Sequence, residues 1–410
     1  MEHEQRLMPE TCNMTDFCRT RDLFDLPEGM VYLDGNSLGP LPKAAAARIA
    51  RTVSDEWGGM LIGGWNKAGW MEMPARLGDR IGALIGAAPG TTVVGDTLAI
   101  KIYQALAAAL SLRPDRRVIL SDTGNFPTDL YMAEGLMETI GKGHELVCVD
   151  PERLESAIDD SVAAVMLTQV DYRTGRMHDM ARITEVAHAR GAVMIWDLAH
   201  SAGALPVDIA GCNAEFAAGC TYKYLNAGPG GPAFIYTRPD IADKVRPTLS
   251  GWLGHAAPFA FDLDYRPGAG SARMRVGTPP ILQMAALEAA LDVWNGVDMP
   301  ALRARSIELS GRFIAGVEAA CPMLTLASPR DPTKRGSQVS FRFENGYAAM
   351  QALIARGVVG DFRAPDIMRF GVTPLYIGEA EIDRAVEILA TVMRERLWDA
   401  PEYHQRAAVT

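Results

Sequence analysis

The sequence lacks the marks of several classes of protein. Its 410 residues contain no uninterrupted apolar run of about 18 residues, the length that a membrane-spanning helix requires. The first residues, Met1 to Arg6, carry no apolar core, so we expect no secretory signal. Acidic residues outnumber basic ones, 50 to 40, and the net charge of −10 disfavours a broad nucleic-acid-binding surface. We therefore expect a cytoplasmic protein that binds neither membranes nor nucleic acids.

Cysteine is scarce and is not arranged for metal binding. The six cysteines form no C-x-x-C pair, and no group of Cys and His has zinc-finger spacing. Cys212 and Cys220 follow His200 in the chain, but their spacing is irregular and disfavours a metal site. Reduced thiols are the simpler interpretation, and we expect no metal ion.

The sequence does have a repeated pattern of buried strands alternating with helices. Hydrophobic residues make up 48% and charged residues 22%, proportions typical of a soluble globular protein. Continuous apolar runs predict strands buried on both faces at 92–94, 117–120, 145–149, 163–167 and 192–196. Helices are predicted between them at 98–110, 128–139 and 180–190. The alternation predicts an α/β fold in which helices cover both faces of a mostly parallel sheet.

A second, smaller unit is predicted after this domain. A long helix predicted at 281–294 leaves the large domain. The second unit contains predicted helices at 299–319, 347–356 and 379–395 and a strand at 338–343. The Pro- and charge-rich run 328–337 is expected to be an exposed loop. The irregular start of the chain is expected to lie over the large domain and join the site. The expected parts are an N-terminal segment 1–40, a large domain 41–285 and a small α+β domain 286–410.

The segment from Trp196 to Gly231 has the layout that a pyridoxal phosphate enzyme requires. Asp197 ends an apolar strand, and Lys223 follows among aromatic and small residues before a glycine-rich turn. In such enzymes a lysine forms a Schiff base with the cofactor aldehyde, and a carboxylate keeps the pyridine nitrogen protonated. Taken singly, Asp197 is explained by capping of the next turn and Lys223 by surface exposure. Their combination in one segment favours the cofactor site.

Two further turns fall where a predicted strand meets a predicted helix. Ligands of parallel sheets bind at the carboxyl ends of the strands. In the turn 125–129, Phe126 can stack on a flat ring and Asp129 can bond a ring substituent, although capping of the helix alone explains Asp129. In the turn 95–99, free backbone N–H groups at a helix start suit a phosphate.

On these residues the chain resembles the kynureninase family, pyridoxal phosphate enzymes with the aspartate-aminotransferase fold. The resemblance covers nearly the whole chain, through segments at 33–39, 125–129, 170–175, 196–203, 220–230, 276–280 and 368–376. Several segments are shared with cysteine desulfurases. N-S-L-G, T-Y-K-Y-L-N-A-G-P-G and R-F-G-V-T-P-L-Y are more specific to the kynureninase family. The resemblance implies the fold type I architecture of a large pyridoxal-phosphate-binding domain and a smaller C-terminal domain.

The resemblance implies the contacts of the cofactor. Lys223 would be the Schiff-base lysine, Asp197 would pair with the pyridinium nitrogen, and His200 would lie against the ring. Phe126 would stack on the opposite face. The remaining implied contacts, with ring substituents and phosphate, are Leu98, Ala99, Pro127, Thr128, Asp129, Thr168, Tyr222, Trp252 and Thr278.

The implied site needs a second subunit. Trp252 and Thr278 would come from the partner of a homodimer, which makes the active site a property of the dimer. Leu98 and Ala99 would give only their backbone N–H groups to the phosphate. Some members of the family carry Asn where this chain has Thr278, so this contact departs from their pattern.

The resemblance also implies how the substrate is held. Arg369 would bind the substrate carboxylate bidentately, a geometry that Lys cannot copy. Asn36, Ser37 and Trp65 would line the rest of the site. Members that favour 3-hydroxykynurenine carry His where this chain has Trp65, so we expect a preference for L-kynurenine. The alternative interpretation of Trp65 is a structural anchor remote from the substrate ring.

The implied reaction is hydrolytic cleavage of the β–γ carbon bond of L-kynurenine, and more weakly of 3-hydroxykynurenine. The products are anthranilate or 3-hydroxyanthranilate and L-alanine, in tryptophan catabolism or pyridine nucleotide biosynthesis. Lys223 would act as base at the α carbon and Tyr222 would exchange protons near the γ oxygen. The nearest alternative is a cysteine desulfurase-like enzyme, but Cys321, its candidate nucleophile, directly follows a predicted helix. A non-catalytic regulatory protein would need a DNA-binding module, for which this acidic chain leaves no room.

Overall fold

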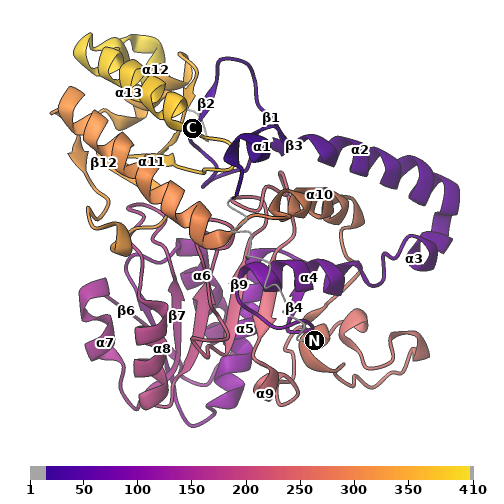
Figure 1. Cartoon of the computed structure of the whole chain (residues 1–410). Helices are drawn as coiled ribbons and strands as arrows, with labels where there is room; N and C mark the ends of the chain where they lie inside the picture. The colour runs from indigo at the N-terminus through magenta and orange to yellow at the C-terminus, as the bar shows by residue number, and fades with distance from the viewer. Residues whose placement is uncertain (1–14, 407–410) are drawn as a thin grey trace, which may run out of the picture.

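A seven-stranded sheet forms the centre of the computed structural model, which describes residues 15–406 (Figure 1). The strands lie in the order β4-β10-β9-β8-β7-β5-β6. Their bounds are β4 (Thr92–Val94), β5 (Val118–Asp122), β6 (Glu145–Val149), β7 (Val162–Thr168), β8 (Val193–Asp197), β9 (Phe216–Gly219) and β10 (Phe234–Thr237). Neighbours from β9 to β6 are parallel, and β10 is antiparallel to both β4 and β9. The predicted mostly parallel sheet is confirmed.

Helices cover both faces of this sheet, which explains its continuous apolar strands. Along β8, Met194 and Trp196 pack into one core, whereas Val193 and Ile195 pack into the other. Residues of α4, α8 and α10 belong to the first core, and residues of α5 and α6 to the second. These helices are α4 (Met73–Leu84), α5 (Leu98–Leu112), α6 (Pro127–Ile140), α8 (Met180–Ala189) and α10 (Ile281–Leu291). Because successive side chains alternate between faces, every position of such a strand is buried. The predicted burial of 145–149 is wrong, because β6 lies at the edge of the sheet and its five residues are exposed or half-buried.

A four-stranded antiparallel sheet forms the C-terminal part, coloured orange to yellow in Figure 1. Its order is β11-β12-β15-β14. The strands are β11 (Thr325–Leu326), β12 (Gln338–Arg342), β14 (Asp361–Arg363) and β15 (Ile367–Gly371). They contact α11 (Met299–Ala320) and α12 (Gly346–Ile354), and α13 (Glu379–Arg394) packs on both helices. The register of β14 and β15 places Asp361 directly opposite Arg369.

The N-terminal segment is joined to this C-terminal part. It contains α1 (Phe17–Arg21), β1 (Phe24–Asp25), β2 (Val31–Tyr32) and β3 (Leu41–Pro42). β1 pairs with β3, whereas β2 pairs in parallel with β13 (Val358–Val359). The backbone N–H of Gly371 also donates to the carbonyl of Leu33 at 2.7 Å. Residues 1–14 of the predicted segment, with Cys12, lie outside the described residues.

An arm of short helices leads from the N-terminal segment to α4. It begins with α2 (Lys43–Arg51), continues as a π-helix over Thr52–Gly58 and ends with α3 (Gly64–Lys67). Figure 1 shows α2 and α3 extending away from the body of the molecule. The remaining short helices are α7 (Leu154–Ala157) and α9 (Pro239–Ala242). Between Thr15 and Arg406, no helix is both long and apolar enough to cross a membrane.

The predicted strands and helices are found with their bounds shifted by only a residue or two, apart from the helix predicted at 281–294. There α10 ends at Leu291, and a 3₁₀ turn completes the predicted range. The predicted exposed loop 328–337 is partly wrong, because Ser328, Arg335 and Ser337 are buried. The Arg335 guanidinium donates to the carbonyls of Pro329 and Arg330, which folds the loop back on itself.

Candidate active site

Lys223 lies at the carboxyl edge of the large sheet, in the turn between β9 and β10. Its Nζ lies 2.9 Å from Nε2 of His200, in the turn after β8. The ring centres of Phe126, which precedes α6, and of Tyr222 are each 5.9 Å from the same atom. Burial raises the pKa of the Tyr222 hydroxyl, so this group stays protonated. Turns that are separate in the sequence thus meet around one amine.

Asp197, the last residue of β8, has a buried carboxylate without an ion pair in the part of the chain that the structure describes. Its Oδ1 accepts a hydrogen bond from the backbone N–H of Ala199 at 2.7 Å, and its Oδ2 lies 3.2 Å from Oγ1 of Thr168. Burial raises the pKa of Asp197, although the charge of Lys223 opposes this effect. A buried acid in this condition is suited to receive a cationic group.

Asn125 links the strand ends around Asp197. Its Oδ1 accepts hydrogen bonds from the backbone N–H of Phe126 at 2.7 Å and from the hydroxyl of Thr168. Its Nδ2 donates to Oγ of Ser121 at 2.9 Å. Thr168, at the end of β7, is therefore held between the turn before α6 and Asp197. Asn125 was not predicted to have a role, and its position in the strand-to-helix turn was the available signal.

Two more buried groups in this region have polar atoms without partners among the described residues. They are Oδ2 of Asp129, in the first turn of α6, and Nδ1 of His200. Burial, followed by the charge of Asp197, raises the pKa of Asp129 well above its usual range. Burial, followed by the charge of Lys223, lowers the pKa of His200 well below its usual range, so its ring is neutral. An amine, a ring face and buried acids that lack ion pairs fit pyridoxal phosphate, whose ring offers complementary groups.

The start of α5 supplies backbone donors for a phosphate. The N–H groups of Leu98 and Ala99 lie in the first helical turn, where they have no partner within the helix. Asp96, just before this turn, has a positive φ of 56° and is held by the Nζ of Lys101 at 2.8 Å. Lys101 is fully buried and also donates to the carbonyl of Met274 at 2.9 Å, so its amine is already engaged. The 15-residue helix adds its dipole to these donors.

Arg369 is buried in the middle of β15 and is bound on several sides. Its Nε donates to Oδ1 of Asp361 at 2.6 Å, and its Nη2 to the other oxygen of the same carboxylate. Nη2 also donates to Oγ of Ser37 at 3.0 Å, and Nη1 to the carbonyl of Tyr172. Arg363 reaches Asp361 from the same face of β14, at 2.9 Å. The bidentate edge of Arg369 is therefore occupied by Asp361, and its contact with a substrate carboxylate stays a prediction.

Asp34 places a second acid beside this pair. Burial, followed by the charge of Asp361, raises the pKa of Asp34 to about 7. Burial acts in the same direction on Asp361, but hydrogen bonding and charge from Arg369 prevail and lower its pKa. The sequence did not lead us to Asp34, Asp361 or Arg363. Charges at alternate positions in the apolar stretch 358–372 were the signal that could have revealed Asp361 and Arg363.

The other predicted site residues have different surroundings. Asn36 is fully buried, and its Nδ2 lies 3.4 Å from Oε1 of Gln338. Trp65 lies on the arm, with its ring edge-on to Trp70 at 5.9 Å. Pro127 and Thr128 open α6 next to Phe126, whereas Trp252 and Thr278 are exposed. The described contacts thus bring several of the predicted cofactor residues together around Lys223. No described contact brings Leu98, Ala99, Trp65, Trp252 or Thr278 to Lys223.

Two family models match the chain. Residues 302–389 match the model of the kynureninase C-terminal domain. Residues 60–246 match that of the DegT/DnrJ/EryC1/StrS aminotransferase family. The chain is also 50% identical over 397 residues to the kynureninases of Pseudomonas fluorescens and of Burkholderia pseudomallei (strain K96243), with 95% of each chain covered.

Solved structures share the fold at low sequence identity. A cysteine desulfurase from Thermococcus onnurineus NA1 superposes with a TM-score of 0.77 at 17% identity, covering 92% of this chain and 98% of that one. The cysteine desulfurase CsdA from Escherichia coli has a TM-score of 0.77 at 19% identity, with coverages of 93% and 99%. At this identity the likeness concerns the fold alone.

Proposed function

Because the chain belongs to the kynureninase family, we propose that it uses pyridoxal phosphate to cleave L-kynurenine. Water would cleave the bond between the β and γ carbons, and the products would be anthranilate and L-alanine. 3-Hydroxykynurenine would be cleaved more weakly, to 3-hydroxyanthranilate and L-alanine. The observation that carries the proposal is the buried carboxylate of Asp197, free of an ion pair, next to the Lys223–His200 pair.

The residues that would hold the cofactor follow from their positions. Lys223 would bond to its aldehyde carbon, Asp197 would face its pyridine nitrogen, and Phe126 and His200 would flank its ring. The contacts with ring substituents and phosphate would come from Leu98, Ala99, Pro127, Thr128, Asp129, Thr168 and Tyr222. When bound, pyridoxal phosphate supplies an electron sink for the charge that develops on the substrate carbons.

The remaining chemistry belongs to side chains of this protein. The amine of Lys223 would take the proton from the α carbon. His200 is neutral, so its Nε2 can accept a hydrogen bond from this amine and orient it. Tyr222 stays protonated and would donate its proton toward the γ oxygen as water adds. Arg369 would attract the substrate carboxylate, with Ser37 beside it. Asn36, which is buried and bonds to Gln338, would line the rest of the site.

We propose a homodimer in which Trp252 and Thr278 complete the active site of the partner subunit. Both residues are exposed in the single chain, as are the neighbouring Phe259, Phe261 and Leu263. Exposed apolar groups concentrated on one segment favour burial against another protein surface. Sedimentation of the loaded protein at micromolar concentration should give the mass of two chains. A monomer that remains fully active would contradict this part of the proposal.

The pathway, location and domain division are also proposals. The reaction would serve tryptophan catabolism or pyridine nucleotide biosynthesis. The five cysteines within the described residues are free thiols, which supports a reducing compartment such as the cytoplasm. Separate sheets at 92–237 and 325–371 support a large domain 41–285 and a small domain 286–410, with the segment 1–40 packed on the site.

The desulfurase alternative has little support from the structure. Its nucleophile would have to be a reactive cysteine on a mobile loop. Cys321 directly follows α11, is fully buried, and has its pKa raised by burial to about 11. At neutral pH this group is a thiol rather than the nucleophilic thiolate.

A direct assay tests the proposed activity. Purified protein loaded with pyridoxal phosphate is incubated with L-kynurenine, and anthranilate and alanine are quantified by chromatography. We expect equimolar products from the wild type and none above background from Lys223→Ala. Absence of both products from a correctly loaded wild type would overturn the proposal, and sulfur release from cysteine would favour the alternative.

The proposed substrate preference depends on Trp65 and Thr278, of which a partner subunit would contribute Thr278. Neither Trp65 nor Thr278 offers the ring hydroxyl of 3-hydroxykynurenine the His and Asn partners of other family members. An unsatisfied buried hydroxyl costs about 1–3 kcal/mol, or roughly one to two orders of magnitude in kcat/KM. The double variant Trp65→His/Thr278→Asn should shift kcat/KM toward the hydroxylated substrate. Equal constants in the wild type would contradict the preference.

A further inference from the structure

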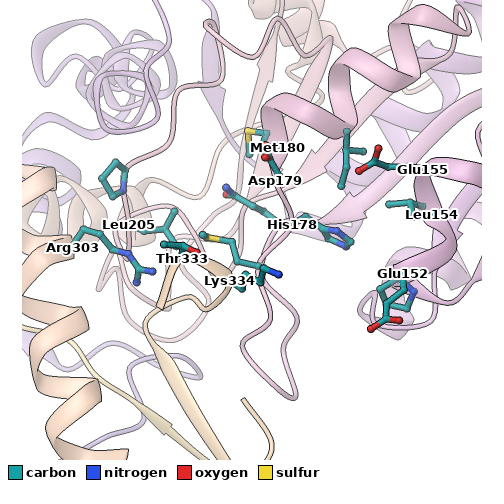
Figure 2. A pocket seen from close by; sticks show the side chains of 15 residues that line it. Glu152, Leu154, Glu155, His178, Asp179, Met180, Leu205, Arg303, Thr333 and Lys334 are labelled. Atoms are coloured by element: carbon teal, nitrogen blue, oxygen red, sulfur yellow. The ribbon is translucent and has the colours of Figure 1, made fainter. Parts of the chain in front are cut away.

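A cavity of about 740 Å³ lies away from Lys223, between the large sheet's helices and the C-terminal part. Figure 2 shows its lining, with Arg303 and the acidic residues Glu152 and Glu155 on opposite sides of the view. Arg303 comes from α11, and Lys334 from the loop before β12. A volume of this size is typical of small-molecule sites. None of these residues has a role in the proposed cleavage of kynurenine.

The cations of this cavity form no ion pair with the described residues, although the exposed Lys334 lies near the charge of Asp331. Nη2 of Arg303 donates to the carbonyls of Pro332 and Arg335, but neither Arg303 nor Lys334 forms an ion pair with any described residue. Burial, followed by the charge of Arg335, lowers the pKa of Arg303 to about 10. Positive charge that is partly buried and uncompensated favours the entry of an anion. A carboxylate matches the planar donor geometry of the guanidinium.

Gln169 adds an unsatisfied acceptor to the lining. Its side chain is 6% exposed, and its Oε1 has no hydrogen-bond partner in the described part of the chain. The backbone on both sides is fixed, because Gln169 donates to the carbonyl of Asp197 at 3.0 Å and accepts from the N–H of His178 at 2.9 Å. Glu152, on the side opposite Arg303, also lacks an ion pair among these residues. The Oε1 of Gln169 and the carboxylate of Glu152 can each accept a hydrogen bond from an N–H group of a ligand.

The walls of the cavity are held together by backbone hydrogen bonds. The N–H of Met177 donates to the carbonyl of Lys334 at 2.9 Å, and that of Gly336 to the carbonyl of Gly175 at 2.8 Å. These bonds join the hairpin after β7 to the loop that carries Lys334. The rest of the lining includes the apolar Met180, Ile183, Leu205 and Pro206 on one wall, together with the polar Glu155, His178 and Asp179. The cavity therefore combines a cationic side, acceptors and an apolar wall in a fixed arrangement.

We propose that this cavity is a second ligand site, which binds a small carboxylate that also carries an amino group on an apolar body. The carboxylate bonds to Arg303 and Lys334, the amino group donates to Gln169 or Glu152, and the body packs on the apolar wall.

Calorimetric titration of the loaded protein with 4-aminobenzoate tests the site, since this probe places both groups on one rigid ring. We expect saturable binding in the wild type, with the dissociation constant raised about tenfold or more in Arg303→Gln and in Lys334→Gln. Lys142→Gln, which removes an exposed charge elsewhere, should bind like the wild type. Arg369→Lys should do the same, because the cavity does not contain Arg369.

Two results would overturn the proposal. One is the absence of saturable binding at millimolar probe. The other is binding that weakens in Arg369→Lys but not in the cavity variants, which would place the probe in the active site only. If Arg303→Gln does not fold, Lys334→Gln decides, since the Lys334 side chain makes no hydrogen bond with the described residues. None of these measurements depends on whether kynurenine is cleaved.

Discussion

The two ends of the proposed active site differ in whether their buried acids form ion pairs. At the edge of the large sheet, Asp197 and Asp129 are buried without ion pairs, and burial raises the pKa of both. At the small sheet, Asp361 is equally buried but is bound by Arg369 and Arg363, and its pKa is lowered. At the first end no ion pair neutralises the acids, whereas at the second Asp361 is already neutralised within the chain.

This difference indicates how each end meets its ligand. A cationic ring that arrives at Asp197 gains an ion pair without breaking one, which favours tight and lasting retention of a cofactor. A carboxylate that arrives at Arg369 must share the guanidinium with Asp361, Ser37 and the carbonyl of Tyr172. Because these existing contacts must be weakened, the net binding free energy is smaller, which suits a substrate that must leave again as product.

The largest expected effect is at the amine of the cofactor end. Lys223→Ala should lose activity by at least about 10³-fold, the scale of acid–base catalysis, together with the visible absorbance of bound pyridoxal phosphate. Borohydride reduction of the wild type followed by peptide mapping should label Lys223. Lys244→Ala, at a surface position, serves as control. Label on Lys101 instead would contradict the assignment of Lys223 as the Schiff-base lysine.

The acid of the same end should have the next largest effect. Asp197→Asn keeps the shape of the side chain but cannot hold a proton on the pyridine nitrogen. We expect retained cofactor absorbance and a loss of about 10²–10³-fold in kcat, the scale of preorganised electrostatic groups. Asp159→Asn changes an exposed acid and should be neutral. Near-normal turnover by the Asp197 variant would contradict the proposed role of Asp197 at the pyridine nitrogen.

At the small sheet we expect a moderate effect on binding. Arg369→Lys should raise KM for kynurenine at least about tenfold, equivalent to ~1.4 kcal/mol, because Lys lacks the planar fork. Arg342→Lys, in the neighbouring strand and paired with Asp366, is the matched control. A lower melting temperature with an unchanged KM would show that Arg369 serves only to neutralise Asp361.

The smallest effect concerns the pH dependence of stability at Asp34. Its folded pKa of about 7 lies above the usual 3.8, so the folded state binds the proton more tightly than the unfolded chain. The resulting stability is complete below pH 4 and is lost as the pH rises toward 7. As the pH is raised from 5 to 8, Asp34→Asn should therefore gain roughly 1–2 kcal/mol of folding stability relative to the wild type, since each pKa unit is worth ~1.4 kcal/mol.

Thermal unfolding at both pH values measures this gain. The exposed Asp22→Asn is the control, and its difference from the wild type should not change with pH. A constant difference for Asp34→Asn as well would mean that Asp34 is ionised in the folded protein throughout this range.

The sequence was informative where structure depends on local pattern. Apolar runs predicted β4 to β8 of the large sheet, and the turns near the strand ends indicated Asp197, Phe126 and Lys223. The small strands β9 and β10 were not predicted, because Ala and Gly in β9 carry little strand preference and β10 reads as a short apolar run among glycines.

The charge cluster could not be predicted for a different reason. Asp361 meets Arg369 only through the register of β14 and β15, which depends on the whole hairpin. Ser37 arrives from the N-terminal segment, far away in sequence. The loop 328–337 was misread because polar composition does not reveal that Arg335 finds carbonyl partners inside the protein.

The pairing of β2 with β13 has a bearing on biosynthesis. Val31 and Tyr32 leave the ribosome long before Val358 and Val359 are made, so β2 has no strand to join during most of translation. The large sheet, in contrast, can form from residues that are already synthesised. A nascent chain should thus acquire its cofactor end before its carboxylate end, which would keep molecules without β13 to β15 from acting on substrate.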